Sequence, residues 1–142
     1  MSEENKRVMR HAFEEIIGRK NVDYVDRALA SDFAGHDTAG ETFSRDDFRQ
    51  GVLEMHNGFS DPRVTIEDQL ADGDKVVTRW RANGIHSGTF RGIPATGRSV
   101  SLTGISIDRI ANGTILESWE VTDDAGLLKQ LGVLPEPELA AR

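Results

Sequence analysis

The sequence predicts a single α+β domain in which helices come first and a mostly antiparallel sheet follows. Apolar residues recur with a helical period of 3.6 in about the first 58 residues and with a strand period of 2 from Val64 onward. Helices followed by a run of strands are typical of α+β proteins. A length of 142 residues without a linker or repeat fits one domain, which we place at residues 1–134. Residues 135–142 are predicted to form a loosely ordered tail, because prolines interrupt regular pairing there.

Two helices are predicted before residue 31. The first spans about Glu3 to Ile17, with its apolar residues on one helical face, Ser2 as a candidate N-cap and Gly18 at its end. The second helix is shorter and spans Asn21 to about Ala30, again with one apolar side.

A third helix has the strongest start signal in the chain. Ser44 and Asp47 have the spacing of a capping box, and Phe43 and Phe48 have the spacing of a hydrophobic staple. The helix is expected to continue towards Gly58 and to cover the buried face of the sheet that follows.

Four strands are predicted after the third helix, at residues 64–70, 76–86, 98–110 and 115–122. In the third of these, the apolar positions change phase between the first half and the second half. A β-bulge near Thr103 and Gly104 would explain the change, and bulges often lie beside functional sites. The segment Gly92 to Gly97 is predicted to be a loop.

The turn between the last two strands decides which face the final strand buries. A two-residue loop at Asn112-Gly113 would place Trp119 opposite Ser106, with polar neighbours. An odd-length loop instead separates the apolar and polar residues of the two strands onto opposite faces. The apolar set is Ile105, Ile107, Trp119 and Val121, and the polar set is Ser106, Asp108, Ser118 and Glu120. This separation favours the odd loop, an inward apolar set and an inward Asp123.

Composition excludes several classes of function. The net charge of −7 and the dispersed arginines argue against binding to nucleic acid. No apolar run is long enough to span a membrane, and the first residues lack the apolar core of a secretory signal, so we expect a cytoplasmic protein. The absence of cysteine excludes disulfides and thiol chemistry. No histidine spacing is typical of a metal site, so no metal is expected.

Two parts of the sequence resemble SnoaL-like polyketide cyclases. The run from Gly84 to Arg98 is similar to the family signature G-x-H-x-G-x-F-x-G-x-P-x-T-G-[KR], and the ending is similar from Arg109 to Gly132. The resemblance implies the cone-like α+β barrel of ketosteroid isomerase and nuclear transport factor 2, with helices on a strongly curved, four-to-six-stranded sheet. It also implies a homodimer or higher homo-oligomer, and an intramolecular aldol condensation without metal or cofactor on a hydrophobic small molecule.

In this resemblance, the acid/base aspartate of the family corresponds to Asp123. Burial beside Trp119 would raise the pKa of its carboxyl group towards neutrality, as a general acid/base requires. The alternative is that Asp123 only caps the closing helix, where backbone N–H groups would favour the charged form.

Other candidate site residues lie on the strands. His86 is predicted to line the pocket and assist catalysis, and His36 to approach the cavity mouth, although a solvent-facing role is the alternative for each. Trp80 and Trp119 are expected to form core and cavity wall together. On the strand before the last turn, where the cyclases carry assisting polar residues, the chain offers Ile107 and Arg109; Arg109 would reach substrate or pair with Glu117.

The sequence therefore predicts a cyclase-like enzyme with Asp123 as general acid/base. Two alternatives keep the same pocket. One is an isomerase or a hydroxylase-type relative, and the other is a domain that binds an apolar ligand without changing it and dimerises through the outer face of its sheet.

Overall fold

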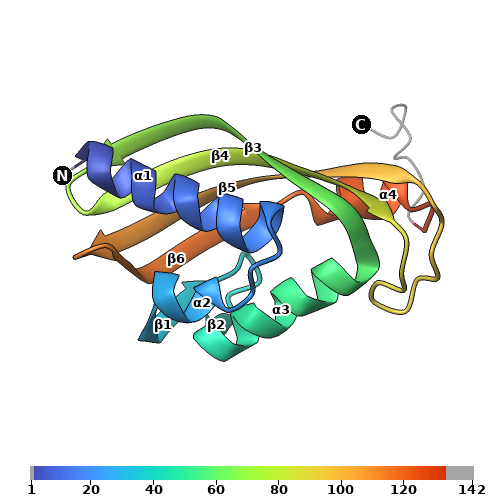
Figure 1. Cartoon of the computed structure of the whole chain (residues 1–142), viewed down its shortest axis with the longest axis horizontal. Coiled ribbons are helices and arrows are strands. Elements are labelled where there is room, and N and C mark those ends of the chain that lie inside the picture. Colours follow the sequence, from blue (N-terminus) through green and yellow to red (C-terminus); the bar gives the residue numbers. More distant parts are fainter. Residues whose placement is uncertain (1, 134–142) are drawn as a thin grey trace.

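A computed structural model describes residues 2–133 and shows helices packed on one side of a curved sheet (Figure 1). The elements, in chain order, are α1 (Ser2–Phe13), the π-helical turn η1 (Glu14–Gly18), α2 (Tyr24–Ala28), β1 (Leu29–His36), β2 (Thr42–Ser44), α3 (Arg45–Gly58), β3 (Phe59–Asp72), β4 (Lys75–His86), β5 (Ser99–Ala111), β6 (Thr114–Thr122) and α4 (Asp124–Gln130). The predicted α+β class is confirmed. The predicted tail at residues 135–142 lies outside the described residues.

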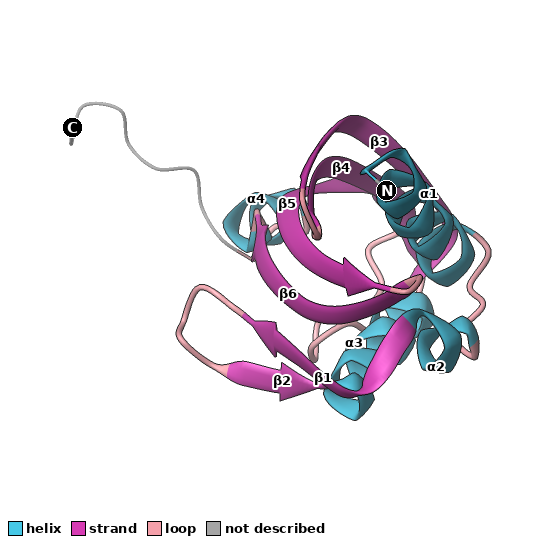
Figure 2. Cartoon of the chain, turned by 90° about the vertical axis from the view of Figure 1, so that its left-hand side faces the viewer, coloured by secondary structure: helices cyan, strands magenta, loops and turns pink. Residues whose placement is uncertain are grey.

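Within these residues the strands form one six-stranded sheet in the order β2-β1-β6-β5-β4-β3. All neighbours are antiparallel except β1 and β6, which run parallel. Figure 2 shows that the sheet curls strongly around the space beneath the helices. This is the cone-like fold that the resemblance implied. None of the helices in residues 2–133 has the length and hydropathy needed to cross a membrane.

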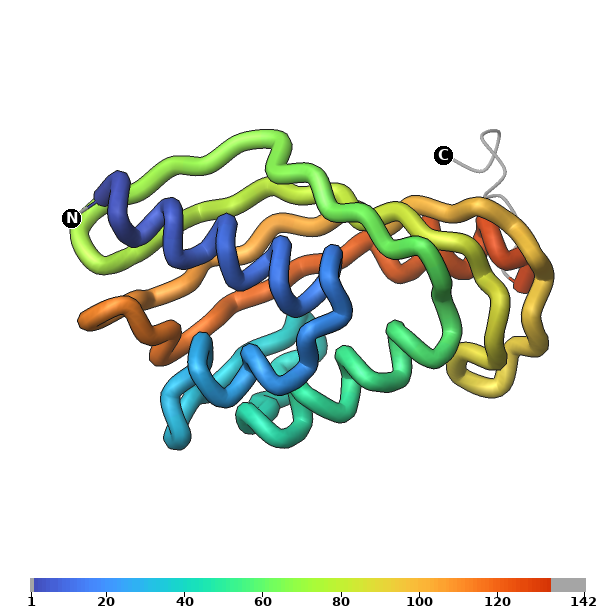
Figure 3. The backbone as a smooth tube through the Cα atoms, in the orientation of Figure 1, coloured from blue at the N-terminus to red at the C-terminus, as the bar shows by residue number. Residues whose placement is uncertain are grey.

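Helices α1 and α3 cover the concave face of the sheet. Helix α1 lies along β3 and β4, and α3 contacts β1 and β3 (Figure 3). The predicted inward face of β4 is confirmed, because Val76, Thr78 and Trp80 are all buried. Val76 belongs to one buried hydrophobic cluster with Val25 and Ile110.

The first and third predicted helices are confirmed. The first extends through η1 to Gly18, and the third begins where expected. The backbone N–H of Asp47 donates to Ser44 Oγ at 3.1 Å and the Asp47 carboxylate accepts from the Ser44 N–H at 3.0 Å, which completes the capping box. Phe43 and Phe48, the staple residues, both pack on the ring of Phe33.

The prediction of a second helix over residues 21–30 is wrong in its extent. Helix α2 covers only Tyr24–Ala28, and the chain then enters β1, which the sequence did not predict. Strand β1 pairs in parallel with β6, more than 80 residues away in sequence, with His36 beside Trp119. His36 therefore lies at the end of a strand rather than in a loop.

The predicted bulge at Thr103 and Gly104 is also wrong. Strand β5 pairs with β4 without interruption from Lys75–Arg109 to Ile85–Ser99. Its even-numbered residues face the helices throughout, so Ile105 and Ile107 face outward.

The last turn combines features of both predicted alternatives. It is a two-residue turn at Asn112-Gly113, whose φ values are 51° and 76°. The pairing register of β5 and β6 shifts between Arg109 and Ile110. This shift brings Trp119 opposite Ile107, as the odd-length loop would have done. The pairing prediction is therefore confirmed, but the predicted faces are reversed, because Val121 is exposed and the polar set faces inward.

Candidate active site

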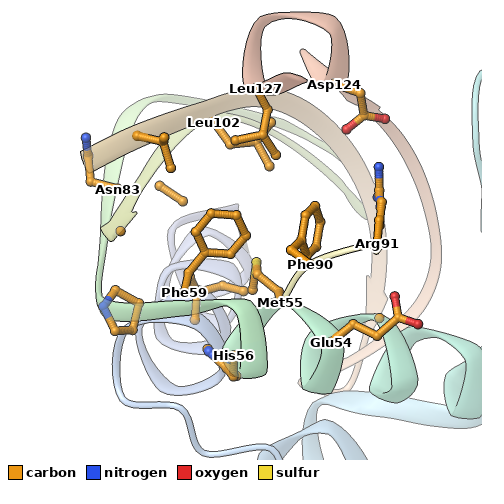
Figure 4. A pocket seen from close by; sticks show the side chains of 16 residues that line it. Glu54, Met55, His56, Phe59, Asn83, Phe90, Arg91, Leu102, Asp124 and Leu127 are labelled. Atoms are coloured by element: carbon orange, nitrogen blue, oxygen red, sulfur yellow. The ribbon is translucent and has the colours of Figure 1, made fainter. Parts of the chain in front are cut away.

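The concave face of the sheet encloses two adjoining cavities. The larger has a volume of about 420 Å³ and lies between α1, α3 and strands β4 to β6. The smaller, of about 160 Å³, lies between the end of α3, the start of β3 and α4 (Figure 4). Both are lined mainly by apolar side chains, and they share Met55, Leu102, Arg91 and Asp124 in their walls. Together they form one mostly apolar chamber.

Two carboxylates stand on the sheet side of the larger cavity. Asp108 on β5 and Glu120 on β6 line it together with Ser106 and Ser118. In the pairing of the two strands, Ser106 is opposite Glu120 and Asp108 is opposite Ser118. The two acids are therefore diagonal neighbours on the same face, which lie roughly 7–8 Å apart, with their Cβ atoms somewhat closer.

Asp108 is almost completely buried, with 3% of its surface exposed. Burial disfavours the charged carboxylate and raises its pKa to about 6, although hydrogen bonds from Ser118 and Ser106 act in the opposite direction. The Ser106 Oγ donates to Asp108 Oδ2 at 2.8 Å. Asp108 is thus held in one orientation and titrates close to neutral pH.

Glu120 has a still higher pKa, of about 7. Burial is the largest cause, followed by repulsion from the negative charges of Asp108 and Asp124. Glu120 keeps part of its surface accessible and lines the larger cavity. A carboxyl group that titrates near pH 7 on a cavity wall can both accept and return a proton.

Trp80 forms the wall beside the carboxylates. It lines the larger cavity with its indole packed over Gly104 of the neighbouring strand and against the ring of Phe13. A Cβ atom at residue 104 would lie 2.4 Å from Trp80 Cζ2, so only glycine leaves room for the indole. The prediction that Trp80 belongs to both core and cavity wall is confirmed.

Asp123 does not face the cavity, and the prediction of an inward carboxylate is wrong. Its side chain is exposed, and its Oδ1 accepts the backbone N–H of Gly126 at 3.0 Å as the N-cap of α4. It lines neither of the two cavities. The acid/base role expected for Asp123 required burial, whereas the structure shows the alternative, a helix cap.

His86 is fully buried rather than exposed to the cavity. Its ring packs on Phe59, which itself lines the smaller cavity, and its Nδ1 lies 2.9 Å from Thr96 Oγ1 and accepts the Thr96 backbone N–H at 3.2 Å. His86 lines neither cavity. It fastens the loop that contains Thr96 to the end of β4, which is a structural role.

The remaining predicted site residues lie on the outer face of the sheet. His36 Nε2 lies 2.8 Å from Glu117 Oε2, and the Arg109 Nη2 donates to Glu117 Oε1 at 3.3 Å. The pairing alternative for Arg109 is therefore confirmed. Trp119 stacks on His36, and Ile107 is 38% exposed beside them. Neither cavity is lined by His36, Ile107, Arg109 or Trp119, so the prediction that these residues belong to the wall or the mouth of the pocket is wrong.

The prediction that Asp108 and Glu120 share one face of the sheet is confirmed, but that face lines the cavity and does not point to solvent as expected. A usable signal was present in β5. Val100, Leu102 and Ile110 have the same parity as Ser106 and Asp108, so an unbroken strand places the acid on their buried face. Among the described residues, no group of three or more His, Asp or Glu side chains is arranged to hold a metal ion.

Solved structures of other proteins share this fold. AclR from Streptomyces galilaeus, provisionally described as a hydroxylase, is 22% identical and superposes with a TM-score of 0.90 over 99% of this chain and 93% of its own. IdmH from Streptomyces antibioticus, provisionally described as a polyketide cyclase, is 28% identical with a TM-score of 0.80, covering 91% of this chain and 99% of its own. TsrD from Streptomyces laurentii is 28% identical with a TM-score of 0.79, covering 92% and 96%. None of the curated proteins matches the sequence. A family model described as SnoaL-like polyketide cyclase matches residues 7–131.

Proposed function

The chain belongs to the SnoaL-like polyketide cyclase family, and from that premise we propose that it is an enzyme whose general acid/base is Glu120. The substrate is a hydrophobic, polyketide-like ketone that closes a ring by intramolecular aldol chemistry. The observation that carries the proposal is the raised pKa of Glu120, about 7, on the wall of a mostly apolar cavity of about 420 Å³.

The proton transfer follows from this position. The Glu120 carboxylate removes a proton from a carbon next to a carbonyl group. The electron pair of the broken C–H bond delocalises onto the carbonyl oxygen, which gives an enolate. The enolate carbon attacks a second carbonyl carbon of the same molecule and forms the C–C bond. The electron pair of the C=O π bond moves onto its oxygen, and the protonated Glu120 returns the proton to that alkoxide. The reaction is redox-neutral, and Glu120 ends as the carboxylate in which it started.

Asp108 acts in this scheme by tuning Glu120. Its negative charge is one cause of the raised pKa of Glu120, and a higher pKa makes the carboxylate a stronger base. The hydrogen bond from Ser106 fixes the Asp108 carboxylate, so that this charge stays on the cavity side of the sheet. Asp108 is therefore a positioning residue rather than the base.

The first half of the reaction can be tested with 2-tetralone, an apolar bicyclic ketone. Exchange of its α-hydrogens in D₂O is followed by proton NMR with the wild type, Glu120→Gln and Asp123→Asn. A general base contributes typically 10²–10⁴-fold, so the wild type should accelerate exchange and Glu120→Gln should lose at least about a hundredfold. Asp123→Asn, the matched control, should exchange as the wild type does. Melting temperatures verify that both variants are folded.

Two results would contradict the proposal. If Glu120→Gln exchanges as fast as the wild type, the base is another group. If the wild type binds 2-tetralone but exchanges it no faster than buffer, the domain binds an apolar ligand without acting on it. An isomerase would share the exchange step and would differ in returning the proton to carbon instead of oxygen.

A further inference from the structure

Arg91 is the only lysine or arginine among the described residues that line the two cavities. The other ionisable groups in these walls are the carboxylates of Asp47, Glu54, Asp108, Glu120 and Asp124, and His56. Burial lowers the pKa of His56 and so favours its neutral form, although the hydrogen bond between its Nε2 and the carbonyl oxygen of Ile16, at 2.7 Å, acts in the opposite direction. Among the described residues in these walls, Arg91 is thus the one group with a permanent positive charge.

The guanidinium of Arg91 is available to a ligand. None of the ion pairs formed by residues 2–133 includes Arg91, and its one ring contact is with Phe90, whose centroid lies 4.9 Å from Arg91 Cζ. Figure 4 shows the side chain at the edge of the smaller cavity, between Asp124 and Glu54. Arg91 is exposed to solvent and lines both cavities, which places it where they open.

The backbone at Arg91 is unfavourable for an arginine. Phe90 and Ile93 exchange two backbone hydrogen bonds, of 3.0 and 2.8 Å, around a tight turn. Its two central residues, Arg91 and Gly92, have φ values of 48° and 77°. Such a turn prefers Asn, Asp or Gly at the first central position, because glycine has no Cβ atom and the short polar side chains of Asn and Asp can hydrogen-bond to the nearby backbone. The fold alone would therefore favour asparagine over arginine at this position.

We propose that Arg91 selects substrates that carry a carboxylate at the end remote from the reacting carbonyl group. The inference rests on the proposed function, since it names the substrate class of the same site. A negative group is repelled by the acids in the chamber wall, and among the described residues of that wall only Arg91 carries a permanent positive charge that attracts it. The substrate enters with its uncharged ketone end first. Its carboxylate stays at the mouth, and the ketone end reaches Glu120.

The test compares two probes that differ in one charge, 2-naphthoate and its uncharged methyl ester. Their dissociation constants are measured by titration calorimetry at low salt for the wild type, Arg91→Asn, Arg91→Lys and Arg7→Gln. Arg7 is an exposed arginine on α1 that lines neither cavity, so its variant controls for the loss of one positive charge. Arg91→Asn keeps the turn, because asparagine tolerates positive φ.

The wild type should bind the carboxylate more tightly than the ester. Arg91→Asn should weaken naphthoate binding by roughly two- to fivefold, the range for an exposed ion pair, and leave ester binding unchanged. Arg91→Lys should retain most of the preference, Arg7→Gln all of it, and added salt should reduce it. The melting temperature of Arg91→Asn should equal or exceed that of the wild type.

The proposal is overturned if the wild type does not prefer the carboxylate, including if it fails to bind it. It is also overturned if Arg91→Asn weakens both probes equally, which would mean a change in cavity shape, or if Arg7→Gln has the same effect. These outcomes concern binding alone. In the tetralone assay, a wild type that exchanges no faster than buffer, or a Glu120→Gln variant that exchanges as fast as the wild type, would instead contradict the role of Glu120, so failure of one proposal is distinguishable from failure of the other.

Discussion

Replacing Asp108 by asparagine should make the protein more stable at neutral pH and leave its stability nearly unchanged in acid. The carboxylate is almost completely buried, and burial raises its pKa from 3.8 to about 6. An acid whose pKa is higher in the folded state binds protons more readily there than in the unfolded chain. The wild type therefore loses stability as the pH rises from about 4 to about 6, and above this window the loss is constant.

The magnitude follows from the difference of about two pKa units. At 1.36 kcal/mol per unit, the ionised Asp108 costs about 3 kcal/mol of folding free energy at pH 8. An asparagine side chain has nearly the shape of the protonated acid and can still accept the hydrogen bond from Ser106. Asp108→Asn should therefore gain up to about 3 kcal/mol relative to the wild type as the pH rises from about 3.5 to about 8.

The assay is urea unfolding of both proteins across this pH range. The informative quantity is the change with pH in the difference between their unfolding free energies, because any constant cost of the substitution cancels. Asp68→Asn removes an exposed carboxylate on β3 and is the matched control for charge. If the difference in unfolding free energy between Asp108→Asn and the wild type does not vary with pH, the conclusion that ionised Asp108 destabilises the folded protein is refuted.

Two further predictions concern residues outside the cavity. Asp123→Ala should lower the unfolding free energy by roughly 0.5–2 kcal/mol, as for loss of an N-cap, and should retain the ketone exchange activity. Denaturant titration measures the first effect and the tetralone assay the second. Loss of exchange in a folded variant would mean that Asp123 has a catalytic role after all. The outer face of the sheet, where Ile105, Ile107 and Val121 are 47%, 38% and 56% exposed, predicts the homodimer that the resemblance implied. Val121→Glu should shift sedimentation from dimer to monomer, and a monomeric wild type would rule out this interface.

Local signals in the sequence predicted most of the elements correctly. The capping box at Ser44 and Asp47 fixes the start of α3, and the alternation through Val76 and Trp80 fixes the inner face of β4. Strand β1 could not be predicted in this way, because what stabilises it is parallel pairing with β6, a partner distant in sequence. Residues that follow a short helix without strict alternation give no local sign of that pairing.

The site was misplaced for a physical reason. The apolar-inside rule assigns Ile105 and Val121 to the core and the acids to solvent. In this sheet Ile105 and Val121 are exposed, and Asp108 and Glu120 face the cavity. Buried acids are unfavourable for folding, and proteins retain such unfavourable arrangements chiefly where function requires them. The face of the sheet on which acids are buried is therefore the face on which the proposed reaction takes place.

The titration of the Glu120 carboxyl group is the most direct test of the proposal that Glu120 is the general acid/base. Carbon-13 NMR of protein labelled at the glutamate side-chain carboxyl would follow each glutamate with pH, and the signal missing from Glu120→Gln identifies the one in question. We predict a midpoint of about 7, moving lower in Asp108→Asn because one source of repulsion is removed. A midpoint near 4.5, the ordinary value for glutamate, would mean that this carboxylate is solvated and too weak a base for the proposed reaction.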